Sequence, residues 1–593
     1  MPEYQYPGVY VEEVGSGPPT IAGVGTTTTA FAGPTLMGPV AGAPGTGVPS
    51  LLRSFGDFQN IYGGYGDLNL SLPAPDPRKA VNYTAMAVKA FFDNGGSMLY
   101  VSRVHASTPG VTGATISPGI ASSGSVSTDS VIVTARFPGA MLNGQVVTIE
   151  LVAIKTHNIA NLPPGTLLGT PGSDGSAAVF YTNGSGTTFM SNGATPEPLP
   201  SSPPADLYSL TLQVTVPAAS GEMMVYSDLG FDPAGANFIG SVLGSNPPRQ
   251  MDALQNQVWI EIGAELATPF QLFKVLFPTW TDPAAGAIAV ASFTLSGGND
   301  GIEPSAANYV TALNSLQSLG DIAIVGTPGA GLYSDAHNIM VSALIPHVEA
   351  PRAYRVAILE SGPDLSDSEY QNLRSQLDSS YAALYVPWVL TPSPRALPGT
   401  GIATQVSVSP TGFVAGIYAR SDTEKSVAKA PANEVVVGAV DLERQIDLAE
   451  QQVLNPLGIN CLRYFPGQGY RVWGARTASS NPEWKYVNVR RYLVYLEHSI
   501  DNGTQWAVFE TNSPALWVRV IAAVDSFLYK EFTAGNLLGT TPANAYFVRC
   551  DRTTMTQNDL DNGRLVCLIG VAVLKPAEFV IFRIEQLTAS ASS

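Results

Sequence analysis

Apolar positions along the chain follow two periods, one typical of helices and one typical of strands. The clearest helical period lies in residues 80–93, where the apolar face consists of Tyr83, Met86, Ala87, Ala90 and Phe91. The run Asn94-Gly95-Gly96 has the composition of a helix C-cap, and residues 98–104 follow as a predicted buried strand. Residues 54–65 are rich in aromatic residues and predict a loop or short helix.

Residues 306–390 alternate regularly between these two periods. The predicted helices are 306–319, 335–346 and 367–377, and the predicted strands are 321–325, 354–360 and 382–390. Such strand–helix–strand alternation implies right-handed crossovers and a largely parallel sheet. Two more helices are predicted at 410–420 and 442–454. The expected fold class is therefore a multidomain α/β protein with a mainly parallel core sheet.

The pattern of apolar and polar residues changes in residues 105–248. Short alternating runs at 131–136, 145–154 and 208–216 are separated by clusters of Gly, Ser, Thr and Pro. This pattern predicts a β-rich domain inserted into the α/β core. The core would then comprise residues 31–104 and 249–455.

Residues 455–479 combine two short strands with a glycine-rich turn. The strands, 459–465 and 469–475, flank a turn in which Gly467 and Gly469 supply the positive φ that it needs. Arg471, Trp473 and Arg476 follow closely. The pattern leaves both a plain hairpin and a ligand-binding loop open.

The C-terminal block also alternates. We expect helices at 488–500 and 514–532, the second with Ser513 as its cap, and strands at 506–509, 545–550, 564–574 and 578–586. The strand 564–574 is apolar on both faces, so it should be covered on both sides. In the last strand, Phe579, Ile581 and Arg583 alternate with Val580, Phe582 and Ile584. A terminal strand this hydrophobic cannot stay a free edge.

The N-terminal 30 residues also contain a predicted strand that has no partner nearby in the sequence. Residues 4–11 are rich in β-forming residues, and the segment behind them is too rich in Gly and Thr to pack a core alone. We expect an extended strand on a flexible tether, whose backbone must find its partners elsewhere. Two unpaired strands on one chain predict strand addition between copies.

The composition and net charge of the chain limit the kinds of partner that it is expected to bind. The chain has 593 residues, 13% of them charged, and a net charge of −17, which argues against a nucleic-acid surface. Cys461, Cys550 and Cys567 have no paired spacing and are expected to be reduced. The start has no basic and apolar leader, and the longest apolar run is too short to span a membrane. We therefore expect cytoplasmic synthesis without a signal peptide, and no direct membrane insertion.

One stretch resembles a dinucleotide site. A predicted strand leads into Gly326, Gly329 and Gly331, a helix follows, and Glu360 ends the next strand. The glycine spacing differs from the fingerprint, and Pro328 stands where backbone amides should converge. A nucleotide-binding α/β enzyme remains the alternative interpretation. No phosphate loop, nucleophile elbow or histidine ligand spacing occurs, so we predict no catalytic, cofactor-binding or metal residue.

Taken together, these segments resemble contractile tail sheath proteins of phages and of contractile injection systems. The residues that carry the resemblance are PGVYVEEV (7–14), GVGTTTTAFAG (23–33), FFDNGGSMLYVSRV (91–104), NPLGINCLRYFPGQGYRVWGART (455–477), YVNVRRYLVYLEHSI (486–500), NDLDNGR (558–564) and PAEFVIFRIEQ (576–586). Residues 105–248 carry no such pattern. A surface adhesin built on them is a further alternative, which the lack of a leader disfavours.

The resemblance implies a structural protein and not an enzyme. It implies subunits stacked as six-fold rings around an inner tube, which contract to drive the tube through a target envelope. Partners would be further copies of the chain, the tube protein, and baseplate and tail-terminator or cap proteins, with no nucleic acid. The particle would be a phage tail or a contractile injection particle.

The resemblance also assigns segments and residues. It implies an N-terminal arm (1–30), an outer domain (105–248), an α+β inner domain facing the tube (456–575) and a C-terminal arm (576–593). The implied arm-strand residues are Tyr6, Val9, Tyr10, Val11, Glu12, Phe579, Val580, Ile581, Phe582, Arg583 and Ile584. The candidate tube-facing residues are Asp525, Lys530, Asp559 and Asp561. The receiving sheet would belong to the inner domain.

Overall fold

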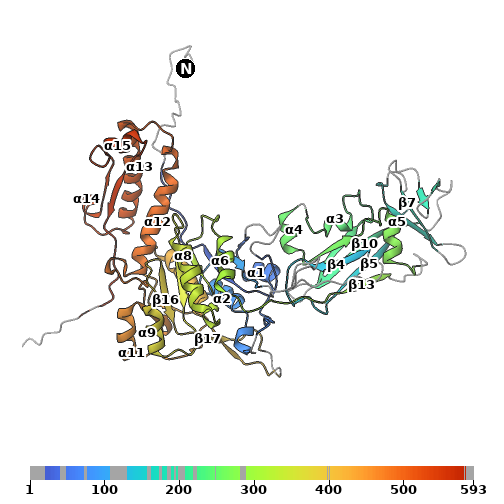
Figure 1. Ribbon diagram of the computed structural model, residues 1–593, viewed down its shortest axis with the longest axis horizontal. Helices are drawn as coiled ribbons and strands as arrows, with labels where there is room; N and C mark the ends of the chain where they lie inside the picture. Colours follow the sequence, from blue (N-terminus) through green and yellow to red (C-terminus); the bar gives the residue numbers. More distant parts are fainter. Residues whose placement is uncertain are drawn as a thin grey trace, which may run out of the picture.

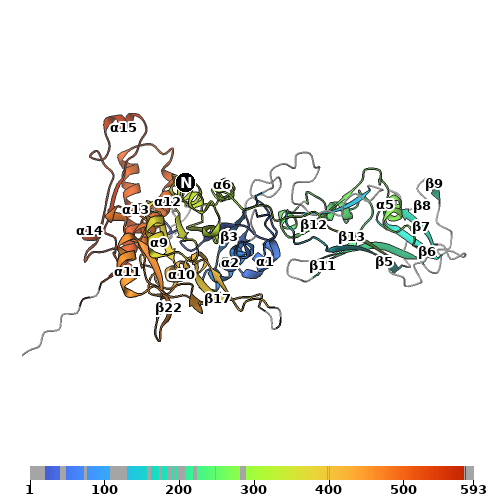
Figure 2. The same ribbon diagram turned by 60° about the horizontal axis from the view of Figure 1, so that its bottom comes forward.

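The computed structural model places an α/β core between a projecting β-rich lobe and a C-terminal domain dominated by two long helices (Figures 1 and 2). It describes residues 20–40, 49–72, 76–106, 130–156, 162–171, 177–182, 189–191, 195–197, 207–217, 223–247, 249–280, 289–396, 399, 401–579 and 581. Of the described helices, none is long and apolar enough to cross a membrane.

A nine-stranded mixed sheet forms the centre of the core, in the order β19-β22-β21-β16-β15-β14-β1-β3-β2. Its strands are β1 (Thr29–Gly33), β2 (Leu51–Leu52), β3 (Leu99–Arg103), β14 (Ile324–Gly326), β15 (Val356–Glu360), β16 (Ala382–Val386), β19 (Glu434–Val435), β21 (Ile459–Phe465) and β22 (Gly469–Val472). The pairings from β3 through β1, β14, β15 and β16 to β21 are parallel, and the outer ones are antiparallel. This agrees with the mainly parallel sheet that the alternation predicts.

Helices cover both faces of this sheet. They are α1 (Phe55–Tyr62), α2 (Tyr83–Asp93), α6 (Ala306–Asn314), α7 (Ala336–Asn338), α8 (Ile345–Glu349), α9 (Asp367–Ser375), α10 (Thr411–Glu424) and α11 (Leu448–Leu454). Alternate strand residues reach opposite cores: Ile358 packs with α2 and α10, and Leu359 packs with α6 and α8. A small sheet of β17 (Val389–Pro392), β18 (Gln405–Val408) and β20 (Asp441–Leu442) lies alongside.

The N-terminal segment enters the core earlier than its composition suggests. The expected arm runs to residue 30, but Thr29 and Ala30 belong to β1 and are fully buried between β3 and β14. Before β1, Ile21 is buried beside the C-terminal helices, and the Thr26 hydroxyl donates to Asp422 (2.6 Å). The Gly/Thr-rich segment packs because two strands and a helix already provide its neighbours.

The β-rich lobe extends beyond its expected boundary at residue 248. Its strands are β4 (Val131–Ala135), β5 (Val146–Lys155), β6 (Leu167–Pro171), β7 (Ala177–Thr182), β8 (Phe189–Ser191), β9 (Thr195–Glu197), β10 (Tyr208–Pro217), β11 (Met223–Leu229), β12 (Val258–Ile262) and β13 (Val290–Thr294). Its helices are α3 (Ile239–Val242), α4 (Gln250–Gln255) and α5 (Pro269–Leu276). Because β12 pairs with β4 and β13 pairs with β5, the lobe continues to about residue 294.

The glycine-rich segment at 455–479 is a hairpin, and it belongs to the core. β21 and β22 pair in antiparallel fashion around Gly467 and Gly469, whose φ angles are 74° and 75°. β21 also pairs with β16 in parallel, which places the hairpin inside the central sheet. The expected start of the inner domain at residue 456 is therefore wrong, because two edge-to-edge pairings hold this segment in the core.

The C-terminal domain is built on α12 (Val487–Gly503) and α13 (Pro514–Thr533), with α14 (Pro542–Ala545), β23 (Tyr546–Arg549), α15 (Gln557–Asp561) and β24 (Leu568–Val571). The Ser513 hydroxyl caps α13, as predicted. The predicted strand at 506–509 is wrong: Gln505–Ala507 form a 3-10 turn, and Phe509 follows with a φ of 67°. A strand needs extended backbone, which this turn does not offer.

Candidate assembly site

The small sheet of the C-terminal domain is incomplete within the described residues. It contains only β23 and β24, which pair from Tyr546–Val571 to Arg549–Leu568. One bridge, between Leu537 and Val573, continues it past the end of β24. A two-stranded sheet with open edges is marginal in water unless other strands or helices complete it.

Apolar side chains lie uncovered on and beside these two strands. Phe547 and Leu568 are each 50% exposed, and Leu538 is 58% exposed. The expectation that residues 564–574 form a strand covered on both faces is therefore wrong for the single chain. The paired strand is confined to the four residues of β24 and the bridge at Val573, and Leu568 on it is half exposed in the described chain.

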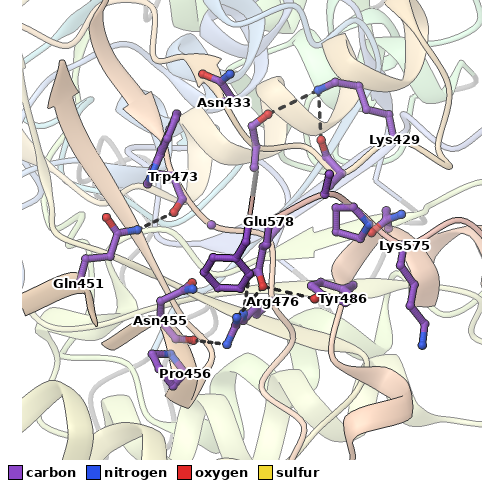
Figure 3. Close-up of a pocket in the computed structure, with 18 of the residues that line it drawn as sticks. Lys429, Asn433, Gln451, Asn455, Pro456, Trp473, Arg476, Tyr486, Lys575 and Glu578 are labelled. Atoms are coloured by element: carbon purple, nitrogen blue, oxygen red, sulfur yellow. Dashed lines mark hydrogen bonds and ion pairs between the residues drawn. The ribbon is translucent and has the colours of Figure 1, made fainter. Parts of the chain in front are cut away.

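The C-terminal arm leaves the body a few residues after this sheet. The Leu574 carbonyl accepts a hydrogen bond from the buried Asn488 amide (3.0 Å). Farther on, both carboxylate oxygens of Glu578 accept hydrogen bonds from the Arg476 guanidinium at 2.6 Å (Figure 3). Such a bidentate pair fixes direction as well as distance, so it orients the chain where the arm begins.

Partial burial and neighbouring cations define the chemistry of this ion pair. The side chains of Arg476 and Glu578 are 6% and 19% exposed. Burial acts to raise the pKa of Glu578, but hydrogen bonding and the charges of Arg476 and Lys485 outweigh it, so the pKa is lowered overall. The Tyr486 hydroxyl donates to the same carboxylate (3.3 Å). Glu578 is therefore ionised at neutral pH.

A groove of about 860 Å³ lies beside the ion pair. Residues 574–579 form one rim. Residues 428–433, α11, the segment after β22 and the start of α12 form the rest, with Trp473 and Gln451 among the lining side chains (Figure 3). Gln451 donates to the Trp473 carbonyl (2.8 Å). The groove offers an apolar wall and few free polar groups, which suits a segment of chain better than a small polar ligand.

The Gly326–Gly331 loop is occupied by the protein's own groups. The Gly331 amide (3.1 Å) and the Thr411 hydroxyl both donate to the Glu360 carboxylate. A Cβ atom on Gly331 would lie 2.3 Å from the Ser361 carbonyl oxygen, so the loop is packed tightly against the next strand. Burial raises the pKa of Glu360 to about 7 against these hydrogen bonds, which lower it. The glycines and the acid serve a tight turn.

Clusters that could hold a metal ion are also absent from the part of the chain that the structure describes. The cysteines are unpaired: Cys461 and Cys550 are buried and Cys567 is partly buried. The pKa of each of the three thiols is raised by burial, which keeps them protonated and unreactive.

Two family models match consecutive parts of the chain. Residues 303–478 match the phage tail sheath protein central domain, and residues 479–586 match the phage tail sheath C-terminal domain. Residues 303–586, a little under half of the chain, thus match domains of the phage tail sheath family. The junction at 478/479 agrees with the placement of the β21–β22 hairpin in the core sheet.

Two curated proteins that the chain resembles are also named as tail sheath proteins. A putative prophage major tail sheath protein of Pseudomonas aeruginosa (strain UCBPP-PA14) is 24% identical over 179 residues, 29% of this chain and 44% of the relative. The tail sheath protein of Vibrio phage KVP40 is 27% identical over 177 residues, 28% of this chain and 25% of the relative. The matches thus span less than half of the length of either curated relative.

The fold has a counterpart that spans the whole chain. The helical sheath of the anti-feeding prophage, solved in its contracted state, superposes with a TM-score of 0.51 and 19% identity. The match covers 98% of this chain and 99% of that chain. This is a sheath-like fold with mixed α/β content, which supports the predicted fold class at that level.

The structure places only some of the sheath arm residues. Of the predicted arm-strand residues, Phe579 and Ile581 are described; they are 73% and 81% exposed and belong to no assigned strand. The remaining predicted arm residues lie outside the described residues: Tyr6, Val9, Tyr10, Val11, Glu12, Val580, Phe582, Arg583 and Ile584. Their roles stay predictions.

The candidate tube-facing residues lie on two elements. Asp525 and Lys530 are exposed on the outer side of α13. Asp559 is engaged within α15, where its carboxylate accepts from the Thr556 amide (3.0 Å) and pairs with Arg564 (3.1 Å). Asp561 accepts from the Gln557 amide group (2.7 Å). Of these four residues, Asp525 and Lys530 on α13 are therefore the more available for contact with another protein.

Sequence reasoning missed the groups that fix the arm. Arg476 stood out only as a cation near the glycine turn, and Glu578 only as the start of a strand. The two residues are 102 positions apart in the sequence, so their contact could not be predicted from local patterns. A usable signal was present: a carboxylate at the root of an apolar terminal strand needs a cation nearby if it is buried.

Proposed function

We propose that this chain is the structural protomer of a contractile sheath and acts by assembly, without catalysis. The observation that carries the proposal is the pairing of a sheath-family segment, residues 303–586, with an incomplete two-stranded sheet in its C-terminal domain. A sheath subunit has to be joined to its neighbours firmly enough to move without separating.

The β23–β24 sheet is the surface that we propose to receive strands from other copies. Its apolar residues Phe547 and Leu568 are half exposed, and among the described residues it has only two strands. Main-chain hydrogen bonds give such added strands affinity, and alternate side chains give specificity. The proposed donors are the N-terminal strand at residues 6–13 and the C-terminal strand at residues 579–585.

The finer arrangement follows the family. Subunits would stack as six-fold rings around an inner tube, with the C-terminal domain facing it through Asp525 and Lys530, and the β-rich lobe pointing outwards. Contraction would be a collective slide of subunits to better-packed interfaces, which drives the tube through a target envelope. Baseplate and cap proteins would close the two ends of a phage tail or contractile particle.

Electron microscopy of the purified full chain tests this function. We expect long hollow cylinders of constant diameter, because head-to-tail contacts between identical subunits propagate without closing. The control is a chain that lacks residues 1–19, which should fold and remain unpolymerised. A wild-type chain that stays monomeric at high concentration contradicts the proposal.

A further inference from the structure

The root of the C-terminal arm is held at two points that differ in kind. The first is Leu574, just after the small sheet, where the buried Asn488 amide donates to the main chain (3.0 Å). The second is Glu578, whose side chain is held by Arg476, with Tyr486 and Lys485 beside it. The first attachment is buried and continuous with secondary structure. The second is a partly buried side-chain attachment, in which the ion pair between Arg476 and Glu578 is the shortest contact.

The three residues between these points form a strap. Lys575, Pro576 and Ala577 have no hydrogen bond to the rest of the described chain, and the side chains of Lys575 and Ala577 are exposed. The nearest hydrogen bond is local, from the Glu578 amide to the Pro576 carbonyl (3.1 Å). No described strand or helix is hydrogen-bonded to the strap.

Two open spaces lie beside Arg476. One is the groove of about 860 Å³, which Glu578 also lines, and the other is a hollow of about 370 Å³, which Lys485 also lines. Arg476 and Pro456 line both spaces. Among the described residues, the far end of the strap is therefore held by the Glu578 side chain, through Arg476, Tyr486 and Lys485.

We propose that the Arg476–Glu578 ion pair is a releasable latch that stores four residues of the C-terminal arm. With the latch closed, the arm leaves the body at Glu578. With it open, the arm leaves at Leu574, and residues 575–578 add up to about 13 Å to its reach. The use of this slack rests on the proposed function, because a strand shared between copies must span a distance that changes as the copies move.

The surroundings of Arg476 make release and closure feasible. Its guanidinium also donates to the Asn455 carbonyl (2.8 Å), so it keeps an acceptor when Glu578 leaves. Lys485 lies 3.6 Å from the carboxylate, and Tyr486 donates to it. When Glu578 leaves, the site between these groups and Arg476 therefore still attracts an anion. The partly exposed Glu578 reaches water by a short movement and is drawn back by two cations.

Chymotrypsin tests the latch in the full chain. It cuts after Phe579, next to the ion pair, and after Phe582, three residues further on, which serves as the reference within the same molecule. Cleavage requires local release of the chain around the cut. The quantity to measure is the ratio of the two initial rates, with the released peptides identified by mass spectrometry.

We expect Glu578→Gln to raise this ratio about fivefold or more, because the amide has no charge to hold the guanidinium. Arg476→Lys should give a smaller rise, since lysine keeps the charge but not the two-pronged geometry. The matched control is Lys575→Gln, a charge change within the strap that should leave the ratio unchanged. An unchanged ratio in Glu578→Gln, or equal rates at both sites in the wild type, would overturn the latch.

The assay is carried out on unassembled chain, so its result does not depend on polymerisation. If the wild type forms no cylinders but Glu578→Gln still raises the ratio, the sheath function fails and the latch stands. If cylinders form and the ratio does not change, the sheath function stands and the latch fails.

Discussion

The two sheets of this molecule differ in how far a single chain completes them. The central sheet has nine strands, helices on both faces and interior residues such as Ile358 with no exposure. The β23–β24 sheet has two described strands, and Leu568 on it is half exposed. Both segments are apolar in sequence. The central sheet therefore stabilises the single subunit. We infer that strands from other copies complete the β23–β24 sheet.

The largest effect on the subunit should come from the central sheet. Ile358→Ala removes a fully buried side chain between α2 and α10 and leaves a cavity. We expect the free energy of unfolding to fall by about 2–5 kcal/mol. Urea unfolding followed by circular dichroism measures it, with Ile358→Val as the milder control at about 1 kcal/mol. A loss below 1 kcal/mol for the alanine variant would show that this core is not closely packed.

A change on the small sheet should hardly affect the subunit but should weaken assembly. Leu568→Ser alters a half-exposed side chain, so we expect unfolding of the monomer to change by less than about 0.5 kcal/mol. The concentration needed for polymerisation should rise about tenfold, which corresponds to about 1.4 kcal/mol lost per contact. Sedimentation at a series of concentrations measures this.

The matched control for that variant lies on the outer lobe. Ile154 is 53% exposed and belongs to β5. Ile154→Ser should therefore leave both unfolding and polymerisation unchanged. Equal effects of the two serine variants on polymerisation would remove the distinction between the small sheet and ordinary exposed surface.

Local patterns in the sequence predicted the elements of the core well. The helix at Tyr83–Asp93 and the strand at Val356–Glu360 lie where periodicity places them, because each buries a single regular face. Boundaries between domains were predicted poorly. Residue 248 lies inside the lobe and residue 456 lies before a core strand, since both depend on pairings between distant segments.

The candidate site shows the same limit. The apolar strand around Leu568 and the exposed Phe579 could be identified as strands that need partners. The residues that fix the arm could not, because Asn488, Arg476 and Glu578 meet only after the chain has folded. A carboxylate at the root of an apolar strand indicates that a cation lies nearby, but it does not indicate which one, 102 positions away in the sequence.

The central claim is that strands from other copies complete the small sheet, and a cryo-electron microscopy map of the polymer tests it most directly. We expect additional strands, traced to the termini of neighbouring subunits, paired beside Tyr546–Arg549 or Leu568–Val571. A polymer in which this sheet still has only its own two strands, with both termini bound elsewhere, would contradict it.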